Sequence, residues 1–369
     1  MKKILFLIPD LSVGGAEKVL VNLVNNLDQS KFDITVQTLF AGGVNEQFLK
    51  AGIKLRHCFK RVFRGNSQLL KLLSPKQLYK LFVKEHYDIV VSYLEGTVSR
   101  IVSGCHVPNT KLVSWIHVQQ ETNSKFSYAF RDLNEAKNCY SKFDKIVCVS
   151  EYVKSDFKRL SDYIGDLVVL YNTNETNQIL ELSKHPMSVD FDKEQINICV
   201  VGKITKHKGV LRVLNIQKKL IDDGYNTHIY FLGTGPLEND VVRFVEMNKI
   251  ENKITLLGYN TNPYNYIRSS DMFLCASYGE GFSTAATEAL IVGTPVCTVD
   301  VSGMKEMLGE NNEYGIVTEN SEEALYKGIK LLLDNPELLE HYKRKAFERG
   351  KLFSTENTVK AVEDMLLSL

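Results

Sequence analysis

The chain has 369 residues, more than the roughly 250–300 at which a single hydrophobic core stops growing, so two domains are expected. Hydrophobic residues make up 44% and charged residues 24%, as in a globular protein rather than a disordered or membrane-spanning one. The formal net charge of +1 gives no overall reason to expect a nucleic-acid partner.

The start of the chain and its cysteines indicate a cytoplasmic protein. The apolar run ILFLI (residues 4–8) is shorter than a signal-peptide core and no small-residue cleavage site follows it, so it predicts a buried strand. No charge-poor apolar run of about 18 residues occurs, so any membrane contact is expected to be peripheral. The seven cysteines are scattered without a CxxC pair, which favours reduced, buried thiols over disulfides or a zinc site.

Strand-length apolar runs alternate with helix-period segments, which predicts parallel sheets built from βαβ units. The predicted strands are residues 4–8, 33–40, 88–92, 110–116, 145–150, 167–170, 196–202, 227–233, 253–258, 271–277 and 294–300. A polar stretch that contains Pro186 separates the two halves. We therefore expect a domain at 1–175, a linker at 176–195, a second domain at 196–352 and a last helix at 353–369 that packs back on the first domain.

A pair of glycines follows the first strand, in PDLSVGGAEKVL. Gly14 and Gly15 open a helix whose buried stripe is expected to be Ala16, Val19, Leu20, Leu23 and Val24. Paired glycines let a ligand approach the backbone closely. A full GxGxxG pattern is absent, so an ordinary tight turn remains the alternative.

Residues 47–84 form a basic segment that contains no Asp or Glu. Its basic residues are Lys50, Lys54, Arg56, Lys60, Arg61, Arg64, Lys71, Lys76, Lys80 and Lys84. Interleaved apolar residues such as Phe59, Phe63 and Leu70 are expected to insert shallowly into an anionic membrane surface. The alternative is a solvated face that acids elsewhere in the fold neutralise.

His117 ends the strand KLVSWIH on its carboxyl side, the edge at which open parallel sheets bind ligands. A lone histidine in such a place is more often structural. In the second half, GKITKHKG follows a predicted strand with Gly202, Lys203 and Lys208, which together suit a diphosphate. A solvated lysine-rich loop is the alternative there.

The segment SYGEGFSTAATEALIVGTPV is the most informative part of the chain. Ser283 is a predicted N-cap, and Gly293 followed by Pro295 predicts the end of the helix. The free N–H groups at the start of such a helix attract phosphate. Glu280 falls in the loop before the helix and Glu288 lies one to two turns inside it.

These motifs resemble family 4 of the glycosyltransferases, a retaining family with the GT-B fold, in which two Rossmann-like domains face each other across a cleft. The resemblance covers essentially the whole chain and is most specific in EGFSTAATE, which is similar to the family's paired-glutamate motif. Further similarity lies in GGAEKVL, VSEYVKSDF, VLYNTN, VGKITKHKG and FLGTGPLE. Lys203 departs from the family pattern, which usually has arginine there, and lysine lacks the bidentate fork.

The resemblance implies a role for each matching residue. Glu288 is expected to hold the ribose, Glu280 the hydroxyls of the transferred sugar, and Lys208 with Lys203 the diphosphate. Backbone amides around Phe282, Ser283 and Thr284 are expected to cap the distal phosphate. His117 is expected to contact the donor sugar, and Gly14 and Gly15 to border the phosphate and acceptor. No cofactor or essential metal is expected, because the lysines neutralise the leaving group.

The resemblance predicts a hexosyltransferase that uses a nucleotide sugar, most readily a UDP-sugar, and a glycan or lipid-linked acceptor for cell-surface polysaccharide or glycolipid synthesis. We expect the protein in the cytoplasm, peripheral to the inner face of the membrane. A nucleotide-sugar 2-epimerase and a non-catalytic scaffold protein of the same architecture are the alternatives. A nicotinamide dehydrogenase is disfavoured, because neither half has GxGxxG followed by an acidic residue about 20 positions on.

Overall fold

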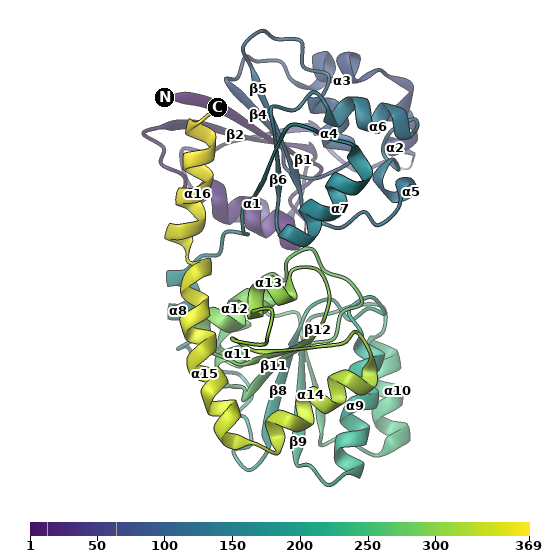
Figure 1. Cartoon of the computed structure of the whole chain (residues 1–369), viewed down its shortest axis with the longest axis vertical. Helices are drawn as coiled ribbons and strands as arrows, with labels where there is room; N and C mark the ends of the chain where they lie inside the picture. The colour runs from purple at the N-terminus through teal and green to yellow at the C-terminus, as the bar shows by residue number, and fades with distance from the viewer. Residues whose placement is uncertain (13, 64) are drawn as a thin grey trace. The chain divides into compact units, whose positions relative to one another are not determined.

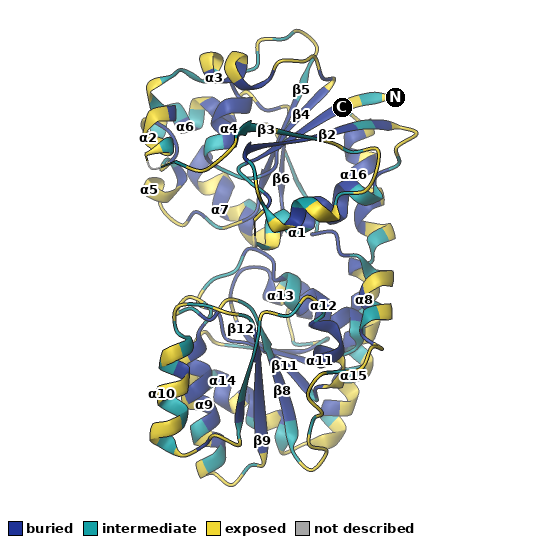
Figure 2. Ribbon diagram, turned by 180° about the vertical axis from the view of Figure 1, so that it is seen from behind, coloured by how far each residue is buried: buried dark blue, intermediate teal, exposed yellow. Residues whose placement is uncertain are grey.

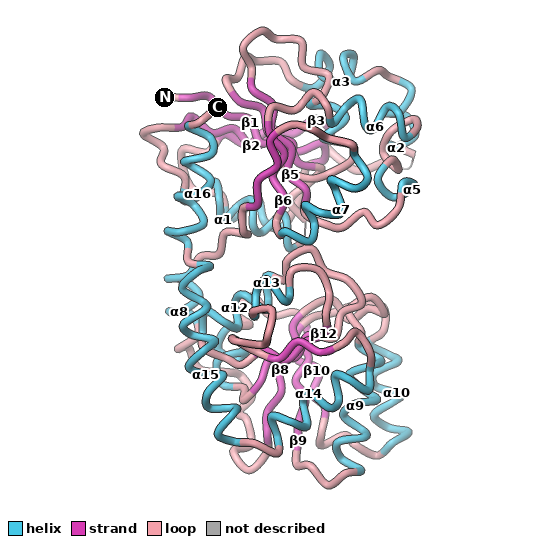
Figure 3. Tube along the Cα trace, in the orientation of Figure 1, coloured by secondary structure: helices cyan, strands magenta, loops and turns pink. Residues whose placement is uncertain are grey.

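The computed structural model describes residues 1–12, 14–63 and 65–369; Arg64 of the basic segment therefore lies outside the described residues (Figure 1). The chain divides into two compact units. The first comprises Met1–Asn174 with Thr355–Leu369, and the second comprises Glu175–Ser354. In each unit the strands form the centre and helices surround them (Figure 3). The predicted class, two doubly wound parallel-sheet α/β domains, is confirmed.

The sheet of the first unit has the strand order β3-β2-β1-β4-β5-β6-β7, with every neighbouring pair parallel. Its strands are β1 (Lys2–Ile8), β2 (Phe32–Phe40), β3 (Lys54–Phe59), β4 (Ile89–Ser92), β5 (Lys111–Ile116), β6 (Lys145–Cys148) and β7 (Asp166–Val169). Its helices are α1 (Gly15–Asn26), the 3₁₀ helix η1 (Val44–Phe48), α2 (Asn66–Leu72), α3 (Pro75–Phe82), α4 (Thr97–Val102), α5 (Asn123–Phe126), α6 (Leu133–Tyr140), α7 (Glu151–Ser161) and α16 (Thr355–Leu367).

The sheet of the second unit has the order β10-β9-β8-β11-β12-β13, again parallel. Its strands are β8 (Ile196–Val201), β9 (Thr227–Leu232), β10 (Ile254–Gly258), β11 (Met272–Cys275), β12 (Val296–Val299) and β13 (Ile316–Thr318). Its helices are α8 (Thr176–Leu182), α9 (Val210–Asp222), α10 (Glu238–Asn248), α11 (Tyr264–Ser269), α12 (Thr284–Val292), α13 (Met304–Leu308), α14 (Glu322–Leu333), α15 (Pro336–Gly350) and the 3₁₀ helix η2 (Lys351–Phe353).

The central strands carry the core of each unit, and the helices expose their outer faces (Figure 2). Residues 4–8 of β1 are all fully buried. Burial on both faces explains why the central strands have continuous apolar runs in the sequence rather than an alternating pattern.

The stretch 176–195, which the sequence predicts to be a linker, includes helix α8. Ile179 of this helix is buried and packs in one cluster with Tyr264 and Ile291 of the second unit. At the other end of the chain, α16 belongs to the first unit. The carboxylate of its Glu363 accepts hydrogen bonds from Lys31 Nζ at 2.7 Å and from the backbone N–H of Asp28 at 2.8 Å.

The basic segment 47–84 is interrupted by β3 and by an aromatic cluster. The rings of Phe59 and Phe63 lie 5.4 Å apart, and both contact Phe40. The side chain of Leu70 is buried. The prediction that Leu70 inserts into a membrane is therefore wrong, because this residue packs within the first unit. Phe59 and Phe63 are half-buried in the aromatic cluster, and their insertion stays a prediction. The exposed large apolar residues of this segment are Phe48, Val62, Leu69, Leu72 and Leu81.

Candidate active site

The loops that follow β8 and β11 lie at the carboxyl edge of the second sheet. These two strands are neighbours, but the chain continues from β8 to β9 on one side and from β11 to β12 on the other. Open α/β sheets bind ligands outside such a reversal of strand order. Lys208 and Glu280 meet here, with Nζ of Lys208 2.5 Å from Oε1 of Glu280.

Glycine lets the two loops approach each other. Gly209, the N-cap of α9, has a φ of 71°, and a Cβ atom at this position would lie 1.9 Å from the backbone oxygen of Ala276. The backbone N–H of Tyr278 donates to the backbone oxygen of His207 at 2.8 Å. Because the backbone of Ala276 occupies the space that a Cβ atom would need, we expect any larger residue at position 209 to push the two loops apart and move Lys208 away from Glu280.

Glu280 is anchored at both its side chain and its backbone. Its Oε1 also accepts a hydrogen bond from Ser277 Oγ at 2.6 Å, and its backbone oxygen accepts one from the hydroxyl of Ser302. The Glu280 side chain is only 11% exposed, against 34% for Lys208. The pair therefore presents a cation at the sheet edge beside a largely buried, oriented carboxylate.

Helix α12 begins directly after this loop, and its predicted caps are confirmed. Ser283 Oγ accepts from the backbone N–H of Ala286 at 3.4 Å, and Gly293 ends the helix with a φ of 84°. Thr284 is the first helical residue, and the ring of the preceding Phe282 is buried. Glu288, in the second turn, is buried. The helix thus starts at the same sheet edge as the Lys208–Glu280 pair.

The two lysines that the sequence groups together differ in their exposure and in their partners. Lys203 is exposed and makes no ion pair within the described residues, whereas Lys208 is half-buried and paired with Glu280. Gly202, which precedes Lys203, has a φ of 150°, and its α-carbon faces the stem of Lys208. Of the predicted basic residues of this loop, Lys208 is therefore the one that the fold brings to Glu280.

In the first unit the strand order reverses between β1 and β4. Gly14 and Gly15 lie in the connection after β1, where Gly14 is the N-cap of α1 in an extended conformation. A Cβ atom at Gly14 would overlap the carboxylate of Glu17, at 2.0 Å. Glu95 follows β4, so each sheet has a glutamate in a loop at its reversal point.

His117 lies next to Glu95, at the carboxyl end of β5. The backbone N–H of His117 donates to Oε2 of Glu95 at 2.9 Å. The imidazole is buried against Tyr93, with ring centroids 4.9 Å apart, and its Nε2 has no hydrogen-bond partner within the described residues. Since buried polar atoms are nearly always bonded in native proteins, this nitrogen is a candidate contact for a ligand.

Comparison with known proteins identifies the family. The profile of the glycosyl transferases group 1 matches residues 183–349, and the profile of glycosyltransferase family 4 matches residues 13–177. Together they cover both units. The chain belongs to the group 1 glycosyltransferases.

Two relatives of this glycosyltransferase match nearly its whole length. It is 26% identical over 383 residues to the N-acetylgalactosamine-N,N'-diacetylbacillosaminyl-diphospho-undecaprenol 4-alpha-N-acetylgalactosaminyltransferase of Campylobacter jejuni, with 99% of each chain covered. It is 22% identical to the amylovoran biosynthesis glycosyltransferase AmsD of Erwinia amylovora, covering 99% of this chain and 100% of AmsD. The solved structure of Anabaena Alr3699/HepE with UDP has a TM-score of 0.78 at 17% identity, with 100% of both chains covered. The fold of the glycosyltransferase is GT-B.

Two residues at these sheet edges are absent from the sequence predictions. Arg212 of α9 is buried, lies 4.1 Å over the ring of Tyr278 and donates to Ala276 O and Asn320 Oδ1 at 3.3 and 2.9 Å. It thereby supports the loop that carries Glu280. Glu95 is the other, and the signal that could have found it is its position in the loop three residues after the buried strand IVVS.

Burial shifts the pKa values of Glu95 and His117 in opposite senses. It raises the pKa of Glu95 to about 7, and it lowers the pKa of His117 to about 3. Between about pH 4.5 and 7 the folded state therefore holds a proton on Glu95 that the unfolded chain has lost, so this contribution to stability is lost as pH rises. Between about pH 3 and 6.5 the unfolded chain holds a proton on His117 that the folded state lacks, so stability rises with pH.

We therefore expect Glu95→Gln and His117→Phe to change the pH dependence of stability in opposite directions. Relative to the parent, the free energy of unfolding of Glu95→Gln should increase as pH rises from about 4.5 to 7. That of His117→Phe should decrease, relative to the parent, as pH rises from about 3 to 6.5. Urea unfolding followed by fluorescence checks this, because Trp115 is the single tryptophan and reports on the first unit alone. Two variants that both keep the parent's pH dependence would show that neither pKa is shifted.

Proposed function

We propose that this glycosyltransferase moves a hexosyl residue from a UDP-sugar to a glycan or lipid-linked acceptor, with retention at the anomeric carbon, during synthesis of cell-surface polysaccharide or glycolipid. The observation that carries the proposal is the Lys208–Glu280 pair at the reversal point of the second sheet, beside the start of α12. It combines a cation for a diphosphate, a carboxylate for sugar hydroxyls and helix amides for a phosphate.

In the proposed reaction the bond between the anomeric carbon and the donor phosphate oxygen breaks, and the acceptor oxygen attacks from the same face. The acceptor proton passes to the departing phosphate oxygen, so no protein nucleophile is required. Lys208, Lys203 and the amides around Phe282, Ser283 and Thr284 stabilise the departing diphosphate electrostatically. Glu288 holds the ribose and Glu280 orients the transferred sugar.

The first unit contributes the remaining contacts. His117 contacts the donor sugar through its Nε2, which has no hydrogen-bond partner among the described residues, and the Gly14–Gly15 loop borders the phosphate and acceptor. We assign Glu95 to an acceptor hydroxyl, because it lies at the reversal point of this sheet and holds the backbone of His117. A neutral imidazole suits a hydroxyl ligand better than an imidazolium does, since it can accept a hydrogen bond.

The names of similar proteins support this choice of donor and acceptor. Anabaena HepE was solved with UDP and with UDP-glucose. The Campylobacter relative is named for a diphospho-undecaprenol acceptor and an alpha linkage. Over the residues described, no helix is long and apolar enough to cross a membrane. A lipid-linked acceptor would then be reached from the surface of the bilayer, and we place the protein peripherally at the inner face of the cell membrane.

Transfer and stereochemistry are tested in one assay. The protein is incubated with UDP-hexoses and with glycan or polyprenyl-diphosphate-linked saccharide acceptors, and UDP release and the product's anomeric configuration are measured by NMR. We expect acceptor-dependent UDP release and an α-linked product. A β-linked product would overturn retention, and conversion of the donor without any acceptor would favour the 2-epimerase.

We also expect activity to survive excess chelator. In the proposed mechanism Lys208 and the helix amides neutralise the leaving diphosphate, and Glu280 and Glu288 bind hydroxyls rather than a cation. Initial rates are measured with and without EDTA after treatment of all components with a chelating resin. A complete loss that manganese or magnesium restores would contradict the metal-free mechanism.

A further inference from the structure

Helix α2 exposes apolar side chains on one face. Leu69 is 54% exposed and Leu72 is 73% exposed, and a spacing of three residues places them side by side on a helix. Between them Leu70 is buried in the first unit. Val62, in the loop before the helix, is 64% exposed. Water therefore contacts two large aliphatic side chains on α2 and a third in the loop before it.

The residues around this apolar group are basic and unneutralised. Elsewhere in the segment, Lys54 pairs with Asp33 at 2.7 Å and Arg56 pairs with Glu85 at 2.6 Å, so these two charges are compensated. The basic residues that make no ion pair with any described residue and flank α2 are Lys60, Arg61, Lys71 and Lys76. Lys50, Lys80 and Lys84 of the same segment also make no ion pair with any described residue, so the unpaired charge is present on both sides of α2 and continues along the segment.

Two arginines hold the end of α2. Arg100, which is only 1% exposed, donates from Nη1 to Leu70 O at 2.9 Å and from Nη2 to Leu73 O at 2.8 Å. It is also bound by both carboxylate oxygens of Glu135, at 3.0 and 2.9 Å. A buried charge is costly to desolvate, so Arg100 requires these partners. Its hydrogen bonds to the two carbonyls therefore hold the end of α2 in place.

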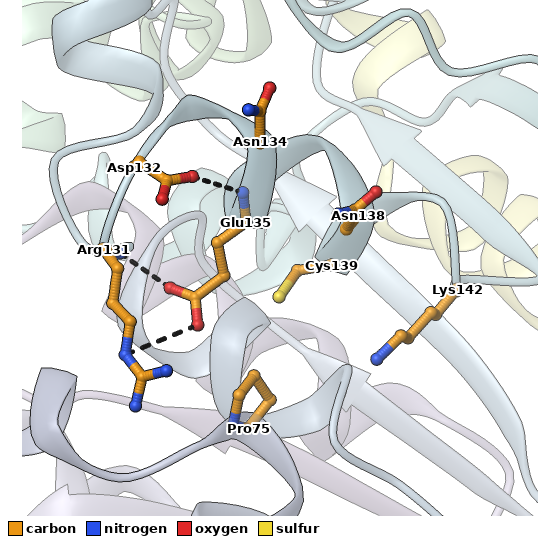
Figure 4. A pocket seen from close by; sticks show the side chains of 8 residues that line it. All are labelled: Pro75, Arg131, Asp132, Asn134, Glu135, Asn138, Cys139 and Lys142. Carbon is orange, nitrogen blue, oxygen red and sulfur yellow. Dashed lines mark hydrogen bonds and ion pairs between the residues drawn. The ribbon is translucent and has the colours of Figure 1, made fainter.

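Arg131 completes the arrangement. Its Nε donates to Lys71 O at 2.8 Å and its Nη2 to Leu72 O at 2.9 Å, while its backbone N–H donates to Glu135 at 2.7 Å. Arg131 and Glu135 line a pocket on α6 that also includes Pro75 at the start of α3 (Figure 4). Four consecutive carbonyls at the end of α2 are therefore capped by side chains, as a seven-residue helix too short to be stable alone requires.

We propose that residues 60–62 and 66–76, here called the α2 platform, dock the first unit on an anionic membrane, with Leu69 and Leu72 inserted among the headgroups. The proposal rests on the proposed function, in its form with a lipid-linked acceptor, and it assigns the contact to α2 and the residues that flank it. The platform residues carry positive charge and include no Asp or Glu, which complements anionic lipid, and the attraction decays over about 8 Å. The arginine cap keeps the leucines presented before contact, so little ordering is needed on binding.

Flotation with vesicles tests the platform. The full-length parent and its variants are mixed with phosphatidylcholine vesicles that contain or lack phosphatidylglycerol, at low and high salt. We expect the parent to bind only the anionic vesicles, and less at high salt. The double variants Leu69→Ser/Leu72→Ser and Lys60→Glu/Arg61→Glu should each bind the anionic vesicles at least about ten-fold more weakly than the parent.

A matched control is Val242→Ser/Met247→Ser, which replaces two exposed apolar residues on α10 of the second unit and should bind as the parent does. Arg131→Lys keeps the charge but loses the two-carbonyl grip, so it should also weaken vesicle binding. Leucine variants that bind like the parent would overturn the proposal. A parent that ignores vesicles but self-associates through these leucines in sedimentation would overturn it in favour of a second copy.

The affinity of each variant for UDP keeps this result separate from the proposed function. The UDP site is assigned to the second unit, so all platform variants should bind UDP as the parent does. Failure of the parent to bind UDP would contradict the proposed function and leave the docking result standing. Unchanged UDP affinity with unchanged vesicle binding would contradict the platform alone.

Discussion

Replacement of Lys208 by alanine is expected to lower kcat by about 10²–10³-fold, with a smaller effect on the affinity for UDP. Charge develops on the diphosphate as the glycosidic bond breaks, and the Lys208 ammonium is the cation that the fold holds at the sheet edge. The variant also removes the 2.5 Å partner of the Glu280 carboxylate, which is only 11% exposed. The uncompensated, largely buried carboxylate would also disfavour the negative charge that develops on the departing diphosphate, and so add to the loss of kcat.

Another lysine of the same loop provides the control. Lys206 is exposed and has no ion pair within the described residues, so Lys206→Ala should leave both kcat and UDP affinity near those of the parent. Steady-state kinetics at saturating donor and calorimetric titration with UDP separate chemistry from binding. If Lys208→Ala weakened UDP binding by the same factor as it lowered kcat, Lys208 would be a ground-state contact and its assigned role would be wrong.

Replacement of Glu288 by alanine is expected to weaken UDP binding by about 10–100-fold, while kcat at saturating donor changes little. Glu288 is buried in the second turn of α12, and its assigned partners are ribose hydroxyls. These hydroxyls do not change charge during the reaction, so their hydrogen bonds contribute equally to the ground state and the transition state. Such an interaction affects binding rather than turnover.

Glu288→Gln is the matched variant, because the amide keeps the size of the side chain and one hydrogen-bond acceptor but loses the charge. It should lie between the parent and Glu288→Ala in UDP affinity. Circular dichroism verifies that α12 is retained in both variants. A variant that bound UDP normally but lost turnover would transfer Glu288 from the nucleotide to the reacting sugar.

Sequence patterns predicted the elements that are buried or capped. The apolar run of β1 and the Ser283 and Gly293 caps of α12 each depend on local chemistry, and both are confirmed. Strand β3 was not predicted, because it pairs only with β2 at the sheet edge and its sequence KLRHCF is half polar. The sequence predicts a linker where the structure has α8, because Ile179 is the one buried residue of this helix and its packing partners are distant in the chain.

The site shows the same division between local and long-range information. The sequence pointed to Lys208 and Glu280 separately, but their pairing depends on the adjacency of β8 and β11, which strand patterns do not determine. Glu95 belongs to no motif, and its position at the reversal of strand order depends on the adjacency of β1 and β4. The apolar residues of the basic segment show the same limit, because the sequence does not indicate that Leu70 is buried or that the rings of Phe59 and Phe63 pack together.

The most direct test of UDP-sugar use is thermal unfolding of the parent protein with a panel of UDP-, GDP- and ADP-hexoses. A ligand that binds only the folded state at about 100 times its Kd stabilises that state by about 2.7 kcal/mol. We predict that UDP and at least one UDP-hexose raise the Tm of the parent, and that Glu288→Ala loses most of this increase. A Tm that no nucleotide sugar raises, or that only GDP- or ADP-hexoses raise, would contradict the assignment of the second unit as a UDP-sugar site.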